Sequence, residues 1–275
     1  MRKHLTLSTH TISYLAGGGD GSRGTVLLLH AFPLNADMWA PQLEALPRGW
    51  RLIAPDLGGF GPSRSSPGSP EMPPMLRDHT ADVLALLDDL HVERAVIGGL
   101  SMGGYVTFAV LRRAPERSRG LVLADTRPQA DSPEARTNRT RMLELLDASG
   151  PAAVAREMLP RLLGETTRRE RPAVGDRITS MITANSAEAI RDAIVWMMAR
   201  PDSTPLLRQV RCPTLVLVGT EDGITPVDDA RQMAGQIPGA ELEVIPGAGH
   251  LSSFECPDAF NAALARFLST RFEER

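Results

Sequence analysis

A single serine at position 101 stands between two pairs of glycines in the stretch IGGLSMGGY, residues 97–105. The spacing Gly99-x-Ser101-x-Gly103 is typical of a serine nucleophile placed on a sharp turn from a strand into a helix. An apolar segment precedes it and a helical pattern follows it, which is the context that such a turn requires. We expect side chains at positions 99 and 103 to collide with the raised serine, so that only glycine fits. The alternative is a glycine-rich turn that serves tight packing alone.

A serine hydroxyl needs a neighbouring base before it attacks a substrate. Among the six histidines, His250 is the best candidate because it follows an apolar strand-like segment in the loop PGAGHLSSFE. Catalytic groups gather at the carboxyl ends of strands in open parallel sheets. Gly247 and Gly249 leave this loop free to direct the ring, and a purely structural histidine is the alternative.

The base in turn needs a carboxylate to orient it. Asp222 lies just past the apolar segment PTLVLVG, in the loop VGTEDGITP, and the adjacent Glu221 is expected to point elsewhere. Asp125, at the end of GLVLAD, is the second candidate because an earlier strand supplies the acid in some folds of this type. We favour Asp222.

Two backbone amides are predicted to stabilise the negative oxygen that forms during attack on a carbonyl. One is the amide of Met102, at the start of the helix behind Ser101. The other is the amide of Phe32, in the loop HAFPL that follows the segment TVLLLH. The Phe32 side chain is then expected in the wall of the substrate pocket.

The elements that position these residues alternate along the chain. Apolar runs without polar alternation predict buried parallel strands, and amphipathic segments between them predict helices. This alternation predicts an α/β fold with a mostly parallel central sheet and helices on both faces. The expected strands are residues 25–30, 51–55, 94–99, 120–125, 213–219 and 241–247, and the expected helices are 79–91, 102–116, 227–237 and 257–270.

Residues 127–207 interrupt this alternation, because they contain no convincing strand and instead about four helical segments. We predict that they form a helical cap inserted over the edge of the sheet, with residues 1–126 and 208–275 forming the core. Trp196, Met197 and Met198 are candidates to line an apolar substrate pocket, or else they form the core of the cap itself. The Gly-, Ser- and Pro-rich segment 61–74 is predicted to be a surface loop.

Composition excludes several classes of protein. A formal net charge of −3 gives no basic field for nucleic acid or for an anionic membrane surface. No stretch approaches the roughly 18 apolar residues of a membrane span, and the N-terminus lacks the apolar core of a signal peptide. We therefore expect a cytoplasmic protein in which Cys212 and Cys256 are free thiols. Neither cysteine has the spacing of a metal site.

Five segments together resemble the α/β-hydrolase superfamily over nearly the whole chain: LLLHAFPLNADMW, APDLGGFGPS, GGLSMGGY, PTLVLVGTEDGITP and PGAGHLSSFECPDAF. The order Ser101, Asp222, His250 is the one expected of that superfamily. Within it, the chain is most similar to 3-oxoadipate enol-lactonases and related small esterases. Two positions depart from the pattern: Ala31 stands where glycine usually follows the histidine, and Cys256 stands where a polar residue is common.

The resemblance implies hydrolysis of a small carboxylic ester or lactone through an acyl-enzyme, with no cofactor and no metal. Three other activities are compatible with the same fold. A carbon–carbon bond hydrolase uses the same three residues. A proline iminopeptidase would need an acidic pair in the cap, and the sequence has no clear candidate for it. A ligand receptor would bind without turnover.

Overall fold

Nine strands form one sheet in the part of the chain that the computed structural model describes, residues 1–65 and 78–272. The strand order is β1-β2-β4-β3-β6-β7-β8-β9, and β5 pairs with β2 at the edge. Pairs from β4 through β9 are parallel, and the pairs that involve β2 are antiparallel. The strands are β1 (Arg2–Thr6), β2 (His10–Gly18), β3 (Gly24–Leu29), β4 (Trp50–Pro55), β5 (Arg64–Ser65), β6 (Ala95–Leu100), β7 (Ser118–Ala124), β8 (Thr214–Gly219) and β9 (Glu241–Ile245).

The six expected strands are present, and the N-terminal pair β1 and β2 and the short edge strand β5 are additions. The sequence signal in β1 and β2 is weak because threonine, serine and histidine break the apolar pattern. The buried Ser13 is nevertheless satisfied, since its amide donates to Ser63 Oγ at 2.8 Å and its hydroxyl accepts from Arg2. Polar residues thus occupy a strand interior because specific partners remove the cost of burying them.

Alternate residues of β3 face opposite layers of the molecule. Val26 and Leu28 belong to the apolar cluster that contains the inner side of α11 (Pro257–Arg271), whereas Leu27 and Leu29 belong to the cluster with α2 (His79–Asp89) and α3 (Met102–Arg113). Both faces of the sheet are therefore covered, which explains why the strands read as continuous apolar runs. The other core helices are η1 (Ala36–Trp39), α1 (Ala40–Leu43), η3 (Pro115–Arg117), α9 (Val227–Gln236) and α10 (Ser252–Glu255).

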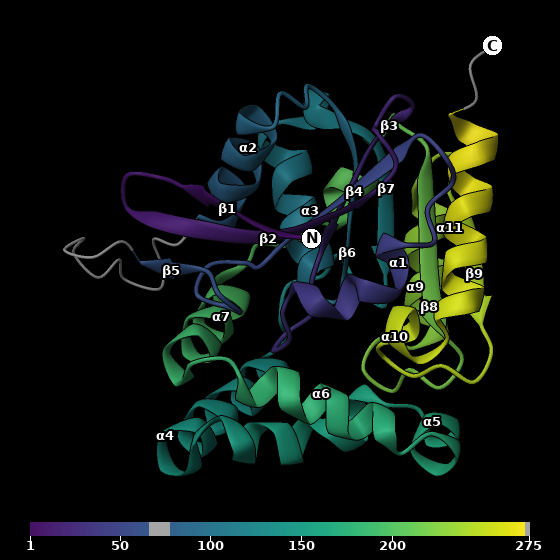
Figure 1. The fold of residues 1–275 in the computed structure, drawn as a ribbon. Helices are drawn as coiled ribbons and strands as arrows, with labels where there is room; N and C mark the ends of the chain where they lie inside the picture. Colours follow the sequence, from purple (N-terminus) through teal and green to yellow (C-terminus); the bar gives the residue numbers. More distant parts are fainter. Residues whose placement is uncertain (66–77, 273–275) are drawn as a thin grey trace.

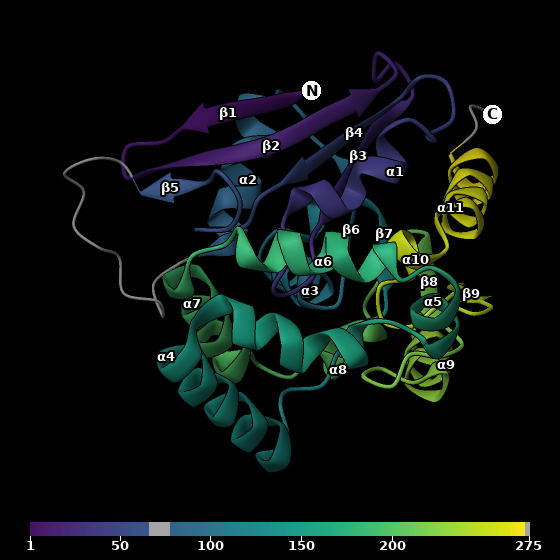
Figure 2. The same cartoon turned by 60° about the horizontal axis from the view of Figure 1, so that its bottom comes forward.

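The described segment between β7 and β8 is helical. It comprises α4 (Pro133–Leu162), α5 (Glu165–Glu170), α6 (Ala173–Thr183), α7 (Ala187–Ala199) and α8 (Thr204–Leu207). Figure 1 shows α4, α5 and α6 together below the strands, and Figure 2 shows α6 running across the front of the sheet beside α4. We call residues 127–207 the cap.

The helix α4 is longer than the sequence pattern suggests because two helical segments meet in it. Gly150 adopts a φ of 70°, and Pro151 follows at the point where the chain bends. Ser132 begins the first segment by accepting a hydrogen bond from the amide of Ala135.

The surface loop expected at 61–74 falls mainly on residues 66–77, outside the described residues. Within the described part, the helices are too short or too polar to cross a membrane.

Candidate active site

Ser101 occupies the turn between β6 and α3 in a strained backbone conformation. Its φ is 55° and its ψ is −112°, a region that non-glycine residues rarely adopt and that costs about 1–3 kcal/mol. The turn is fixed on both sides, since the Ser101 amide donates to the Ala124 carbonyl at 3.0 Å and Thr126 Oγ1 donates to the Ser101 carbonyl at 2.8 Å. The end of β7 therefore holds the serine in place.

The two glycines of the motif are needed for a different reason from the one expected. A Cβ on Gly99 would lie 2.2 Å from the carbonyl carbon of Gly103, so the strand and the helix approach each other too closely for any side chain. A Cβ on Gly103 would lie 2.0 Å from the carbonyl oxygen of Leu29, at the end of β3. The nearest obstruction is thus the packing of α3 against β6 and β3, and not the side chain of Ser101.

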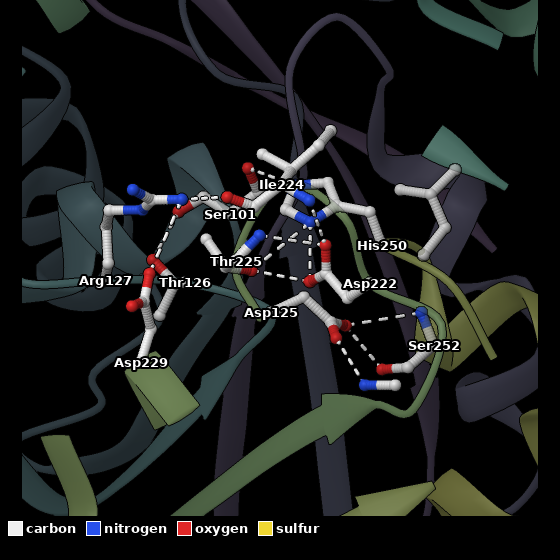
Figure 3. A network of polar contacts seen from close by, with 12 residues as sticks. Ser101, Asp125, Thr126, Arg127, Asp222, Ile224, Thr225, Asp229, His250 and Ser252 are labelled. Atoms are coloured by element: carbon white, nitrogen blue, oxygen red, sulfur yellow. Dashed lines mark hydrogen bonds and ion pairs between the residues drawn. The ribbon is translucent and has the colours of Figure 1, made fainter. Parts of the chain in front are cut away.

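The side chains of Ser101, His250 and Asp222 form one chain of hydrogen bonds (Figure 3). His250 Nε2 lies 2.8 Å from Ser101 Oγ, and His250 Nδ1 lies 2.8 Å from Asp222 Oδ2. Because a carboxylate accepts hydrogen bonds, Nδ1 carries the proton and Nε2 is left to accept from the serine. The structure therefore brings together the three residues that the sequence singled out, from the loops after β6, β8 and β9.

The hydrogen bonds of the Asp222 side chain favour its charged form. Its carboxylate also accepts from the amides of Ile224 and Thr225, at 2.8 and 2.9 Å, and from the Thr225 hydroxyl. Burial alone would raise the pKa of Asp222, but attraction to the protonated form of His250 and these hydrogen bonds bring it below its ordinary value. Thr225, three residues after the acid, was not anticipated from the sequence.

Asp125, the second candidate for the acid, has other partners. Its carboxylate accepts from the Gly219 amide at 3.0 Å and from the amide and hydroxyl of Ser252, and it thereby ties the end of β8 to the loop after His250. Complete burial and the nearby charge of Asp222 raise the pKa of Asp125 well above its ordinary value. Figure 3 shows this second carboxylate behind the hydrogen-bonded chain.

Phe32 and Met102, which carry the two amides predicted as oxyanion donors, follow the carboxyl ends of the neighbouring strands β3 and β6. Met102 opens α3, whose first amides have no acceptor within the helix. His30 Nδ1 lies 2.9 Å from the Ala31 carbonyl, which shares one peptide group with the Phe32 amide, and His30 Nε2 accepts from the Leu57 amide at 3.0 Å. The buried ring thus fixes the plane of the Ala31–Phe32 peptide group, although Ala31 replaces the usual glycine.

A cavity of about 500 Å³ lies between the core loops and the cap. Phe32 and Ile224, from the loops after β3 and β8, and Tyr105, from α3, form its wall on the core side, whereas Ser101 and His250 do not line it. The cap contributes apolar and charged side chains that the sequence did not single out, namely Met142, Met158, Ile194, Arg127, Arg139, Arg161, Arg200, Asp131, Glu134 and Glu157, and Asp229 of α9 adds a further carboxylate.

The three residues predicted to line the pocket lie elsewhere on α7. Trp196 lines a second cavity of about 260 Å³ and packs edge-on against His79. Met197 is buried in the cluster that also contains α2 and α3, and Met198 packs at its edge.

The cap is fastened to the loops that carry the candidate base and acid. The amide of His250 donates to the Leu162 carbonyl at 3.1 Å. Glu221, next to the acid, accepts from the amide and hydroxyl of Thr166, and so it points into the cap as expected. The buried Glu255 accepts from the Gly164 amide at 2.8 Å. The junction of α4 and α5 is therefore part of the framework of the site.

Comparison with known proteins identifies the family of the chain. A model of the alpha/beta hydrolase fold family matches residues 24–257. The solved structure of a thermophilic esterase from Thermogutta terrifontis, with malate bound, is 40% identical with a TM-score of 0.89, and the match covers 99% of this chain and 100% of that one. A 3-oxoadipate enol-lactonase from Acinetobacter baylyi is 27% identical over 94% of each chain. A Caulobacter protein named as a carbamate hydrolase is 28% identical over 92% of this chain and 93% of its own.

Proposed function

This chain belongs to the alpha/beta hydrolase fold family, and we propose that it is a serine hydrolase that cleaves small carboxylic esters or lactones through an acyl-enzyme. The observation that supports this most directly is the hydrogen-bonded chain from Asp222 through His250 to Ser101 Oγ. The esterase and enol-lactonase among the similar proteins favour a carboxylic ester bond as the substrate bond.

In the proposed reaction, His250 Nε2 takes the proton of the Ser101 hydroxyl as the oxygen attacks the ester carbonyl carbon. The charge that develops on the carbonyl oxygen is stabilised by the amides of Phe32 and Met102. His250 then gives its proton to the leaving alcohol, and the acyl group remains on Ser101. A water molecule, deprotonated by His250, attacks this acyl-enzyme; the acyl–Oγ bond breaks, the acid is released, and His250 returns the proton to Ser101 Oγ. Asp222 holds the ring in the required tautomer and stabilises its protonated form.

We propose that this cavity, which reaches Phe32, receives part of a small to medium substrate. Its volume of about 500 Å³ falls in the range of small-molecule sites. Methionine and isoleucine side chains on the cap accommodate apolar acyl groups of varied shape. Arginines and carboxylates on the same wall, several of them paired with each other, offer contacts to a polar substituent.

Other activities remain outcomes of the same test. A carbon–carbon bond hydrolase and a carbamate hydrolase would use the same nucleophile on a different bond. A proline iminopeptidase would favour aminoacyl amides, and a receptor would bind ligands without turnover.

The test is a panel of p-nitrophenyl esters, lactones, carbamates and aminoacyl amides, assayed with the wild type and with Ser101→Ala. We expect the ester or lactone group to be turned over fastest and Ser101→Ala to lower kcat by about 10⁶-fold. Ser180→Ala, an exposed serine on α6, is the matched control. Mass spectrometry after exposure to a fluorophosphonate should find the adduct on Ser101 alone. Full activity of Ser101→Ala, or preferred turnover of aminoacyl amides, would contradict the proposal.

A further inference from the structure

Asn185 is a buried polar residue of the cap, just after the end of α6. The residue is 4% exposed, and its backbone N–H donates to the Ile182 carbonyl at 3.1 Å. A buried amide side chain is costly unless its donors and acceptor all find partners. Its partners therefore indicate what keeps it there.

Most of these partners lie in the core and not in the cap. Asn185 Nδ2 donates to the Pro33 carbonyl at 2.8 Å and lies 3.3 Å from the Leu34 carbonyl. It also donates to the Met181 carbonyl at 3.0 Å, within the cap. Asn185 Oδ1 accepts from the Gly61 amide at 2.8 Å. Three carbonyls on one side and an amide on the other leave only one orientation of the side-chain amide.

The core segment that Asn185 holds is the loop that carries the Phe32 amide. On the inner side of this loop, the Ala31 carbonyl accepts from His30 Nδ1 and from the Leu34 amide, both at 2.9 Å. From the cap, Asn185 binds the carbonyls of Pro33 and Leu34, two and three residues after Ala31. The loop is thus held from the core by His30 and from the cap by Asn185.

The Gly61 contact connects a second core loop to the same side chain. Residues 56–61 follow β4, and the Leu57 amide in this segment donates to His30 Nε2. Asn185 therefore links the two core loops that surround the His30 ring. If the Asn185 side chain moved, the loop that contains Pro33 and the loop that contains Gly61 would both lose a contact. Both loops support the Ala31–Phe32 peptide group.

We propose that Asn185 is a positioning residue for the oxyanion donor at Phe32, so that docking of the cap completes the catalytic geometry. This inference rests on the proposed function. Asn185 does not touch the reacting atoms and acts through the carbonyls of Pro33 and Leu34. Its removal should weaken binding of the transition state more than binding of the substrate, because a misplaced donor fails only when charge develops on the oxygen.

The test compares Asn185→Ala with Asn185→Asp, which keeps the shape but turns an oxygen toward the carbonyls. Ser186→Ala is the matched control: Ser186 is the neighbouring residue, and its hydroxyl accepts from the Ala189 amide to begin α7, so the change weakens the cap without touching the Phe32 loop. kcat and KM for p-nitrophenyl butyrate are measured below the melting temperature of every variant. Binding of a boronic acid transition-state analogue and of butyrate is measured alongside.

We expect both Asn185 variants to lose about 10- to 100-fold in kcat with KM within about twofold. Affinity for the boronic acid should fall in parallel, with little change for butyrate. Ser186→Ala should lower the melting temperature but leave kcat unchanged. If Asn185→Asp does not fold, the Asn185→Ala result decides alone.

A lower melting temperature with normal kcat and normal boronic acid affinity in Asn185→Ala would overturn the inference and leave a purely structural asparagine. Loss of kcat in Ser186→Ala to the same extent would also overturn it. The proposed function fails separately, if wild-type turnover does not depend on Ser101.

Discussion

The guanidinium carbon of Arg200 lies 3.9 Å from the ring centre of Tyr105, and both side chains line both cavities beside the cap. The pair therefore forms a shared wall between a cavity of about 500 Å³ and one of about 260 Å³. Arg200 is held in place by Asp131 and by the carbonyls of Met197 and Gln129. Because Arg200 has these polar contacts, Tyr105 is the better position at which to shorten a side chain of this wall.

Tyr105→Ala should join the two cavities and admit longer acyl chains. Since one methylene group is worth about 10- to 200-fold in specificity in an apolar pocket, we expect kcat/KM for p-nitrophenyl octanoate relative to butyrate to rise at least about tenfold. Tyr105→Phe keeps the ring and serves as the control with an unchanged ratio. An equal ratio in wild type and Tyr105→Ala would show that the smaller cavity does not receive substrate.

Asp222→Asn should abolish most activity, whereas Asp125→Asn should mainly lower stability. The first change removes the acceptor that fixes the His250 tautomer, and losses of about 10⁴-fold in kcat are expected for this role. The second places an amide nitrogen opposite donors on Gly219 or Ser252, at a cost of about 1–3 kcal/mol in the free energy of unfolding. Kinetics and urea unfolding of both variants separate the two carboxylates. A larger loss of kcat in Asp125→Asn would reverse the assignment of the acid.

The sequence predicts a site residue well when the signal for its role lies in the few residues around it, at the turn that follows a strand. Ser101, Asp222 and His250 each follow an apolar strand and stand beside glycines, and these local patterns are visible along the chain. The sequence favours Asp222 but keeps Asp125 as a second candidate, because both residues follow buried strands. Only the arrangement of β7, β8 and the His250 loop gives each carboxylate its own partners.

Residues that act across the cap interface are not predictable in this way. Asn185 and Pro33 are 152 positions apart, and neither lies in a motif that suggests a contact. The sequence offers Trp196, Met197 and Met198 either as the lining of an apolar pocket or as the core of the cap itself. In the structure, burial of these residues against the core uses much of their apolar surface, and the larger cavity is lined from α4 instead.

Acid should destabilise the fold through His30. Burial, with a smaller effect from the nearby His79, lowers the pKa of His30 from 6.5 to about 4, against an opposing hydrogen bond to Ala31. Between these two pH values the unfolded chain binds a proton at this ring and the folded chain does not. Stability is therefore lost as the pH falls from 6.5 to 4, by about 3 kcal/mol from this residue.

Urea unfolding from pH 7 to pH 4 measures this contribution of His30. We expect His30→Gln, which cannot titrate, to be less stable than the wild type at pH 7 but to lose about 3 kcal/mol less on acidification. His4→Gln is the control, because His4 lies exposed on β1. An identical pH dependence for His30→Gln and wild type would contradict a neutral buried ring at this position.

Glu255→Gln should loosen the junction between the cap and the His250 loop. The buried carboxylate accepts from the amides of Gly164 and Leu251, at 2.8 and 3.1 Å, and a glutamine would turn its amide nitrogen toward one of them. We expect a loss of about 1–3 kcal/mol in the free energy of unfolding, together with faster proteolysis in residues 162–166. Thr166→Val, which removes only the hydroxyl contact to the more accessible Glu221, should show a smaller change of the same kind. If Glu255→Gln leaves both the stability and the proteolysis rate of the wild type unchanged, the cap is anchored elsewhere.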